Sequence, residues 1–278
     1  MVGDKGYKGD MGDVGDKGDV GDMGYKGDIG EMGEMGEMGS IRENIAGVRA
    51  RIAAAAARAG RPAEDVTLVC VTKTRSVDEI REVLEAGEFC LGENRVQELM
   101  EKYDKVQDMA GVIDKKRKIM WNLVGQLQRN KVKYITGKVA LIHSVDSFRL
   151  AEEINTRASL LGEPIWVLIQ LNTAGEAQKA GVAFSGCESL AFEIDERLPF
   201  VKLGGLMAVV PAVDDPEEVR GYFRDAKTAF DALAEKRAGA DAGFVHLSMG
   251  MTHDYEVAVE EGSTMVRVGT AIFGPRSM

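Results

Sequence analysis

The stretch Val66-Thr67-Leu68-Val69-Cys70-Val71-Thr72-Lys73 decides the fold of this 278-residue chain. Its apolar and β-branched residues run without a charged interruption, which is typical of a strand buried on both faces of a parallel sheet. Lys73 stands at the carboxyl end of this strand, where closed barrels and doubly wound sheets keep their functional groups. A lysine in this place is more often a solvated strand end than a reactive amine. Its role must therefore be inferred from the residues at the ends of the other predicted strands.

Strand and helix patterns alternate from this stretch to the end of the chain. Apolar, β-branched runs predict eight strands, at residues 66–72, 89–92, 121–125, 140–145, 165–171, 201–209, 244–248 and 265–273. Amphipathic patterns predict helices at residues 41–59, 77–86, 95–107, 128–135, 147–161, 189–197, 217–237 and 253–261. Eight strand–helix units in about 210 residues favour a closed (β/α)8 TIM barrel of the α/β class. An open, doubly wound sheet is the alternative.

The first 39 residues follow a different pattern. Glycine occupies every third position from Gly3 to Gly39, which is the Gly-X-Y signature of a collagen-like tail. This segment contains no proline, so nothing pre-orders it, and we expect it to be disordered as a single chain. A weak trimer, held by Lys-Gly-Asp triplets on staggered strands, is the alternative. We therefore predict a tail at residues 1–39 and a barrel, monomeric by itself, at residues 40–278.

Charge and composition exclude several classes of protein. The net charge is −10, and the ten acids and four lysines of residues 1–39 supply −6 of it. Nucleic acids and anionic membrane surfaces reward clustered positive charge, so we expect neither as a partner. No apolar run is long enough to span a membrane, and the N-terminus lacks the apolar region of a signal peptide.

The cysteines and histidines are few and widely spaced. Three cysteines, an odd number, predict buried free thiols in a reducing, cytoplasmic compartment in preference to disulfides. The histidines lack the spacing of metal ligands, so we expect no metal site. These residues are Cys70, Cys90 and Cys187, and His143, His246 and His253.

Polar residues follow the apolar runs at several of the predicted strand ends. In a barrel these ends converge on one rim. Each residue taken singly is explained by helix capping, because Asn94, Asp146 and Ser147 all precede helical patterns. Their convergence is what predicts a site. The polar segments are 92–95, 125–128, 143–146 and 170–172.

The last two strands predict a phosphate-binding site. The hydroxyls of Ser248 and Thr252 flank a loop that enters a helix, whose N-terminus favours an anion. Gly250 and Gly269 allow backbone amides to approach that anion, and Arg267 adds a permanent charge. The alternative is that the serine caps a helix and the arginine pairs with an acid. A lysine amine across the ring from a phosphate site is the arrangement that pyridoxal 5'-phosphate requires.

Six motifs carry a resemblance to a known family. They are Thr72-Lys73-Thr74, Gly92-Glu93-Asn94-Arg95-Val96-Gln97-Glu98, Gly125-Gln126-Leu127-Gln128-Arg129-Asn130-Lys131, His143-Ser144-Val145-Asp146-Ser147, Leu247-Ser248-Met249-Gly250-Met251 and the stretch from Gly262 to Gly274. In this order the chain resembles the pyridoxal phosphate homeostasis protein (YggS/PROSC) family, over about residues 41–276. The collagen-like tail lies outside the resemblance.

The resemblance implies a barrel like the N-terminal domain of alanine racemase, known as PLP fold type III, with the cofactor held as a Schiff base. Lys73 matches the family's Schiff-base lysine, and Asn94 matches the asparagine near the cofactor ring. The phosphate-binding positions match Ser248, Arg267, Gly269 and Thr270. The implied role is intracellular pyridoxal phosphate homeostasis, with the cofactor and pyridoxal phosphate-dependent apoenzymes as partners.

Two departures from the family pattern stand out. The chain has Trp121-Asn122 where the family usually has Trp-His, which removes a titratable ring and puts the role of that position in doubt. Residues 108–118 form a longer, basic insertion that we expect to be a surface loop.

Whether the protein is an enzyme is a separate question. The sequence ends five residues after Phe273, so we expect no second domain to supply the partner acid or base that racemisation needs. That favours a cofactor carrier over a racemase-like enzyme acting on amino acids. Two further alternatives are a scaffold assembled through the tail, and a sugar-phosphate enzyme with Glu93 or Asp146 as its base.

Overall fold

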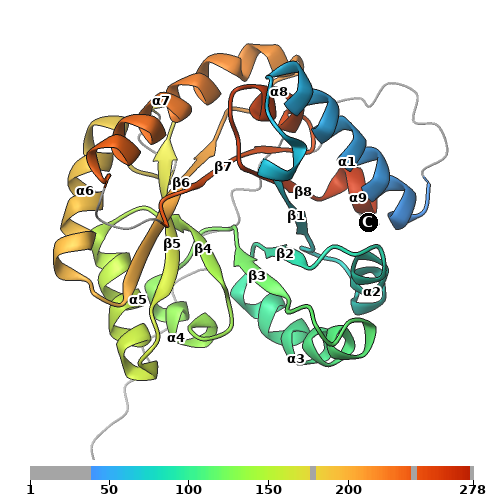
Figure 1. Ribbon diagram of the computed structural model, residues 1–278. Coiled ribbons are helices and arrows are strands. Elements are labelled where there is room, and N and C mark those ends of the chain that lie inside the picture. The colour runs from blue at the N-terminus through green and yellow to red at the C-terminus, as the bar shows by residue number, and fades with distance from the viewer. Residues whose placement is uncertain (1–38, 176–179, 239–242, 276–278) are drawn as a thin grey trace, which may run out of the picture.

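Eight parallel strands close into a barrel in the computed structural model, which describes residues 39–175, 180–238 and 243–275 (Figure 1). The strands follow one another around the ring in chain order, and the last pairs with the first. This confirms the predicted TIM barrel over the open sheet. The strands are β1 (Thr67–Val71), β2 (Cys90–Glu93), β3 (Met120–Leu123), β4 (Leu141–Val145), β5 (Ile165–Asn172), β6 (Val201–Val209), β7 (His246–Met251) and β8 (Met265–Val268).

Helices surround this ring on its outer side, as Figure 1 shows. They are α1 (Ile41–Arg58), α2 (Val77–Glu85), α3 (Val96–Ile113), α4 (Val132–Ile135), α5 (Phe148–Leu161), α6 (Phe184–Arg197), α7 (Arg220–Lys236), α8 (Tyr255–Glu260) and α9 (Thr270–Phe273). Short 3-10 helices are η2 (Ala63–Asp65), η3 (Arg129–Lys131) and η4 (Pro216–Val219). The predicted start of the first helix is confirmed, because Ser40 and Glu43 form a capping box. This helix packs against α2, α8 and α9 and completes the ring.

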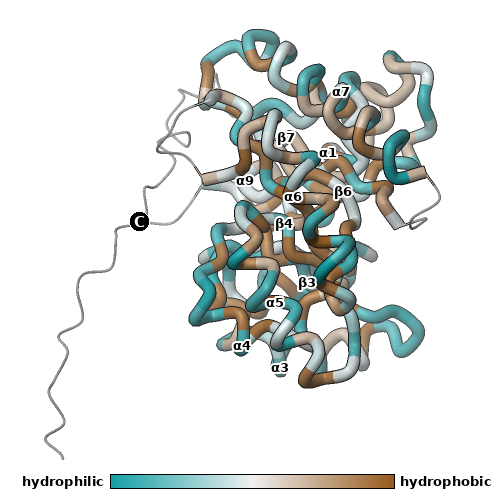
Figure 2. Tube along the Cα trace, turned by 90° about the vertical axis from the view of Figure 1, so that its left-hand side faces the viewer, coloured by the Kyte–Doolittle hydropathy of each residue, from teal (hydrophilic) through white to brown (hydrophobic). Residues whose placement is uncertain are grey.

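Two apolar layers hold the barrel. The larger one lies between the outer face of the strands and the helices, and the smaller one fills the barrel interior. In Figure 2 the hydrophobic segments gather in the middle of the molecule, around β3, β4 and β6. The interior layer is built from Val69, Cys90, Leu141, Leu168, Met207 and Met265. Because side chains alternate along a strand, these six residues show which positions of their strands face inward.

Two predicted element boundaries are wrong. The predicted last strand, 265–273, ends at Val268, and α9 follows it because Gly269 leaves the extended conformation and its carbonyl accepts the amides of Ile272 and Phe273. The expected surface loop at 108–118 is partly helical, since α3 continues to Ile113 and buries Ala110. Other boundaries differ from the predicted ones by a few residues, and α6 begins five residues earlier than expected.

Several expectations fall on other parts of the chain. The Gly-X-Y tail, its disorder and its trimer fall on residues 1–38, outside the described residues, so they stay predictions.

The three cysteines are buried and free, as predicted, and burial raises the pKa of Cys90 to about 12 and that of Cys187 to about 11. Within the described ranges, no helix has the length and apolar character needed to cross a bilayer. The same ranges contain no group of three or more histidine, cysteine, aspartate or glutamate side chains arranged to hold a metal ion.

Candidate functional site

The register of three neighbouring strands brings the predicted lysine and its neighbours to one rim. Val69 of β1 faces the barrel interior, and Lys73 lies in the turn that directly follows the carboxyl end of this strand, at the barrel mouth. Val71 pairs with Gly92 of β2, and Asn94 and Lys73 each follow two residues after that pair. On the other side, Gly269 lies against the backbone of Val71. Lys73, Asn94 and Gly269 thus gather at the carboxyl ends of β1, β2 and β8, respectively.

Asn94 is fixed by a close backbone contact. A Cβ atom on Gly125, just after β3, would lie 2.2 Å from the Asn94 carbonyl oxygen and 2.8 Å from its Cα. Only glycine fits there, because the contact is with backbone and not with a flexible side chain. The helix-capping alternative for Asn94 is wrong, since the N-cap residue of α3 is Arg95. The asparagine side chain is half-buried at the rim.

A chain of hydrogen bonds crosses the barrel interior below this rim. It starts at Asn122, whose Nδ2 donates to the carbonyls of Met120 and Leu91 at 2.9 and 3.1 Å. These bonds orient the amide so that Asn122 Oδ1 faces Nε2 of His143 at 3.0 Å. An amide oxygen only accepts, so this His143 nitrogen carries the proton. Asn122, which stands where the family usually has a histidine, therefore has a structural role: it sets the tautomer of His143.

The same chain continues to the predicted phosphate-binding residues. The unprotonated Nδ1 of His143 accepts from Ser248 Oγ at 3.0 Å, and Arg267 Nη1 donates to that hydroxyl oxygen at 2.7 Å. Arg267 Nη2 donates to the carbonyl of Ala208 at 2.9 Å. The serine is a β7 residue and not a helix cap, so this half of the alternative is wrong. Ser248 and Arg267 lie together, both buried beneath the rim.

Burial holds His143 neutral. Complete burial is the main cause that lowers its pKa well below the usual value of 6.5, and the charge of Arg267 adds to it. The electrostatic result is that the permanent cation of Arg267 lies close to a neutral ring inside the barrel.

The rim next to β8 is built by a loop and the start of α9. Thr252 Oγ1 accepts the backbone amides of Gly269 and Ala271, both at 3.4 Å. The sequence predicted that Thr252 would flank the helix after β7, but its contacts are with α9. Gly250 has φ +92°, and a Cβ there would meet Tyr255 Cα at 2.9 Å. The loop's own packing therefore requires this glycine.

Thr270 is the first residue of α9 and is half-buried beside Gly269.

Glu93 faces away from the barrel mouth. Its Oε1 accepts from Thr72 Oγ1 at 2.8 Å and from Lys102 Nζ at 2.7 Å, between the barrel wall and α3. Burial raises the pKa of Glu93, although Lys102 opposes the shift. This position disfavours Glu93 as the base of a sugar-phosphate enzyme.

Lys102 was not predicted from the sequence. It lies on the apolar stripe of α3 between Leu99 and Val106, which is an unusual place for a lysine.

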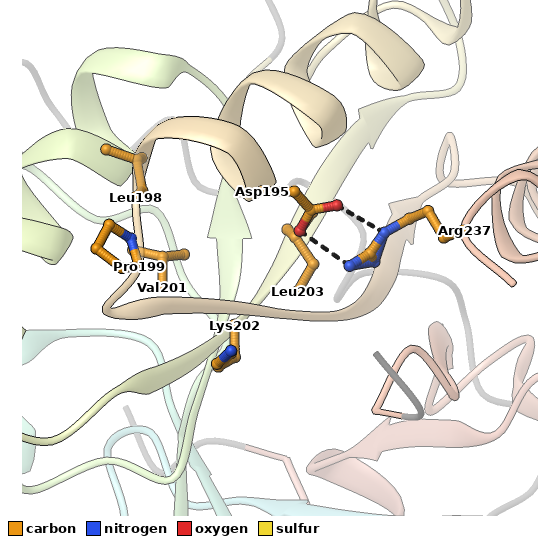
Figure 3. Close-up of a pocket in the computed structure, with 7 residues that line it drawn as sticks. All are labelled: Asp195, Leu198, Pro199, Val201, Lys202, Leu203 and Arg237. Atoms are coloured by element: carbon orange, nitrogen blue, oxygen red, sulfur yellow. Dashed lines mark hydrogen bonds and ion pairs between the residues drawn. The ribbon is translucent and has the colours of Figure 1, made fainter. Parts of the chain in front are cut away.

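A cavity of about 190 Å³ lies on the opposite side of the barrel, at the amino end of β6 (Figure 3). The buried Arg237 side chain and Lys202 line it, and Arg237 forms two hydrogen bonds of 2.9 Å with Asp195. Barrels carry their chemistry at the carboxyl ends of the strands. This cavity is therefore separate from the candidate site.

Comparisons with known proteins show the family to which the chain belongs. A model of the alanine racemase N-terminal domain matches residues 43–277. A relative from Aquifex aeolicus, named pyridoxal phosphate homeostasis protein, is 43% identical over 234 residues, which cover 84% of this chain and 97% of the relative. A crystal structure of an unknown protein from Bifidobacterium adolescentis has 37% identity and a TM-score of 0.77, covering 84% of this chain and 94% of that one. PipY of Synechococcus elongatus, solved with pyridoxal phosphate bound, has 31% identity and a TM-score of 0.71, covering 84% of this chain and 100% of PipY. This chain therefore belongs to the pyridoxal phosphate homeostasis protein family and carries the alanine racemase N-terminal domain.

Proposed function

We propose that this protein binds pyridoxal 5'-phosphate at the barrel mouth and serves pyridoxal phosphate homeostasis as a carrier of the cofactor. One observation supports this above the others: the register places a lysine, Lys73, at the carboxyl end of β1, beside the rim that Gly269 and Thr270 form at β8. The names of the relatives and the bound cofactor in PipY point the same way.

The residues present fit this cofactor. Pyridoxal phosphate, when bound, supplies an aldehyde that condenses with a lysine amine and releases water. We assign the amine to Lys73 and a position beside the ring to Asn94. The phosphate end falls to the β7–β8 side of the mouth, where hydroxyls, a guanidinium and backbone amides of glycines form a donor set suited to an anion. The residues of that side are Ser248, Gly250, Arg267, Gly269 and Thr270.

Holding the cofactor fits the described residues better than turning over substrate. A racemase-like enzyme needs an acid or base that exchanges protons near the lysine. The imidazole of His143 is neutral, and both of its nitrogens are hydrogen-bonded inside the barrel. The carboxylate of Glu93 is bound behind the barrel wall. Racemase-like activity on amino acids remains the second candidate, because the matched domain is that of alanine racemase.

The wider role follows from the same proposal. A carrier delivers its cofactor to pyridoxal phosphate-dependent apoenzymes, which we propose as partners. The buried, free thiols support a reducing compartment, and we propose the cytoplasm. We further propose that the barrel is monomeric and that any trimer forms through residues 1–39.

Trapping the cofactor tests the proposal. Purified protein is mixed with pyridoxal phosphate, reduced with borohydride and mapped by peptide mass. We expect the label on Lys73, together with a visible absorption band that Lys73→Ala loses. Lys105→Ala, which removes an exposed lysine of α3, should keep both signals. A label on other lysines only would contradict the assignment, and robust racemisation of amino acids by the wild-type protein would contradict the carrier role.

A further inference from the structure

A buried group of charged side chains lies directly behind Lys73, on the outer side of the barrel wall. We call Glu93, Glu98 and Lys102 the Lys102 cluster. Lys102 Nζ donates to Glu93 Oε1 at 2.7 Å and to Glu98 Oε2 at 3.4 Å. The side chain of Lys102 is 11% exposed and that of Glu93 is fully buried. Burying these charges is costly, and replacing such groups by apolar residues is often neutral for stability. The cluster therefore calls for an explanation other than stability.

The cluster contacts both peptide groups that flank Lys73. Lys102 Nζ donates to the carbonyl oxygen of Thr72 at 2.8 Å, and this carbonyl belongs to the peptide group before Lys73. Glu98 Oε2 accepts the amide of Thr74 at 2.7 Å, and this amide belongs to the peptide group after Lys73. The orientation of these two peptide groups sets the direction in which the lysine side chain leaves the backbone.

The turn at this point has a conformation that needs support. Thr74 has φ +62° and is the one non-glycine residue with positive φ among the described residues. A β-branched residue rarely adopts this conformation, because Cβ crowds the backbone. Strained residues of this kind persist where surrounding contacts hold them, and they gather at functional sites. Glu98 supplies such a contact to the amide of the strained residue itself.

From these contacts we infer that Lys102 and Glu98 are positioning residues, which direct the Lys73 amine into the barrel mouth without touching the cofactor. The inference rests on the proposed role of Lys73. It assigns to α3 a part in cofactor capture, through two hydrogen bonds to the backbone of the β1–α2 turn.

Two measurements on Glu98→Ala test this. In the protein without cofactor, hydrogen exchange of the Thr74 amide should become roughly tenfold faster or more, because the amide loses its acceptor. Capture of pyridoxal phosphate by Lys73 should fall roughly tenfold or more, since a small misplacement of a reacting group has large effects. Glu98→Gln keeps an acceptor oxygen and should retain most of both properties.

Glu88→Ala is the matched control. Glu88 lies just before the amino end of β2 and forms an ion pair of 2.6 Å with Arg49. Glu88→Ala therefore removes one ion pair, as Glu98→Ala does, but at the end of the strand that is far from the barrel mouth. This variant should capture the cofactor within about twofold of the wild type.

The second positioning residue is tested with Lys102→Met, which leaves Glu93 buried without its cation. If this single variant does not fold, the double variant Lys102→Met/Glu93→Gln is used in its place.

The outcomes separate the two proposals. If Glu98→Ala matches Glu88→Ala in cofactor capture and leaves Thr74 exchange unchanged, the inferred positioning role is wrong. If the wild-type protein captures no cofactor, the proposed function fails by itself. Hydrogen exchange at Thr74 then still decides whether Glu98 holds the turn.

Discussion

Acidification should destabilise this protein through a single buried histidine. The folded state holds His143 neutral, because burial and Arg267 lower its pKa well below the value of about 6.5 that it has when unfolded. The unfolded chain therefore binds one more proton than the folded chain below pH 6.5, and the free energy of unfolding falls as pH falls. The loss is close to zero well above pH 6.5 and approaches about 1.4 kcal/mol per pH unit well below it, so lowering the pH from 7.5 to 5.5, across the titration of the unfolded histidine, costs about 1.4 kcal/mol in total.

Urea unfolding at a series of pH values measures this loss, in protein without cofactor. The variant His143→Gln removes the titrating ring, and its unfolding free energy should depend on pH less steeply by that amount. Burial also lowers the pKa of His246 and raises the pKa of Glu93, but both groups are present in both proteins and cancel in the comparison. Equal slopes for wild type and variant between pH 7.5 and 5.5 would refute the reasoning, because His143 would then take up its proton without cost.

Three glycine substitutions make further predictions, each measured by urea unfolding. Gly125→Ala should lower the free energy of unfolding by about 1–3 kcal/mol, because the new Cβ clashes with the backbone of Asn94. Gly111→Ala is its control in α3, where a Cβ meets nothing within 4 Å, and should raise the free energy by up to about 1 kcal/mol. Gly250→Ala should cost about 1–3 kcal/mol through its positive φ, besides the contact with Tyr255. The interpretation of Gly125 is wrong if Gly125→Ala proves as stable as Gly111→Ala.

The barrel was predictable because its signals are local. The apolar stretch that ends at Lys73 and the seven runs after it each carry their own pattern, and alternation with helices leaves few topologies. The error at the last strand has a physical reason. A short apolar run from Met265 to Phe273 fits a buried strand as well as a buried helix, and the turn at Gly269 decides between them.

The candidate site was predictable only in part. Residues at strand ends share a rim in any barrel, so Lys73, Asn94 and Gly269 could be grouped from the sequence. The bond between His143 and Ser248 joins residues 105 positions apart, and its direction depends on the amide of Asn122. Such a pairing has no local signal. Lys102 does have a local signal in the sequence, because it is a charged residue on the apolar stripe of a helix. Its hydrogen-bond partners, however, are set by the three-dimensional packing.

The hydrogen-bond chain from Asn122 to Arg267 ties the first half of the barrel to the second. Asn122 and His143 belong to β3 and β4, whereas Ser248 and Arg267 belong to β7 and β8. A half-barrel cut from either end of the gene would carry polar groups whose partners lie on the missing half. Each half therefore buries polar groups that only the other half satisfies, and the bond between His143 and Ser248 couples the two halves of the barrel.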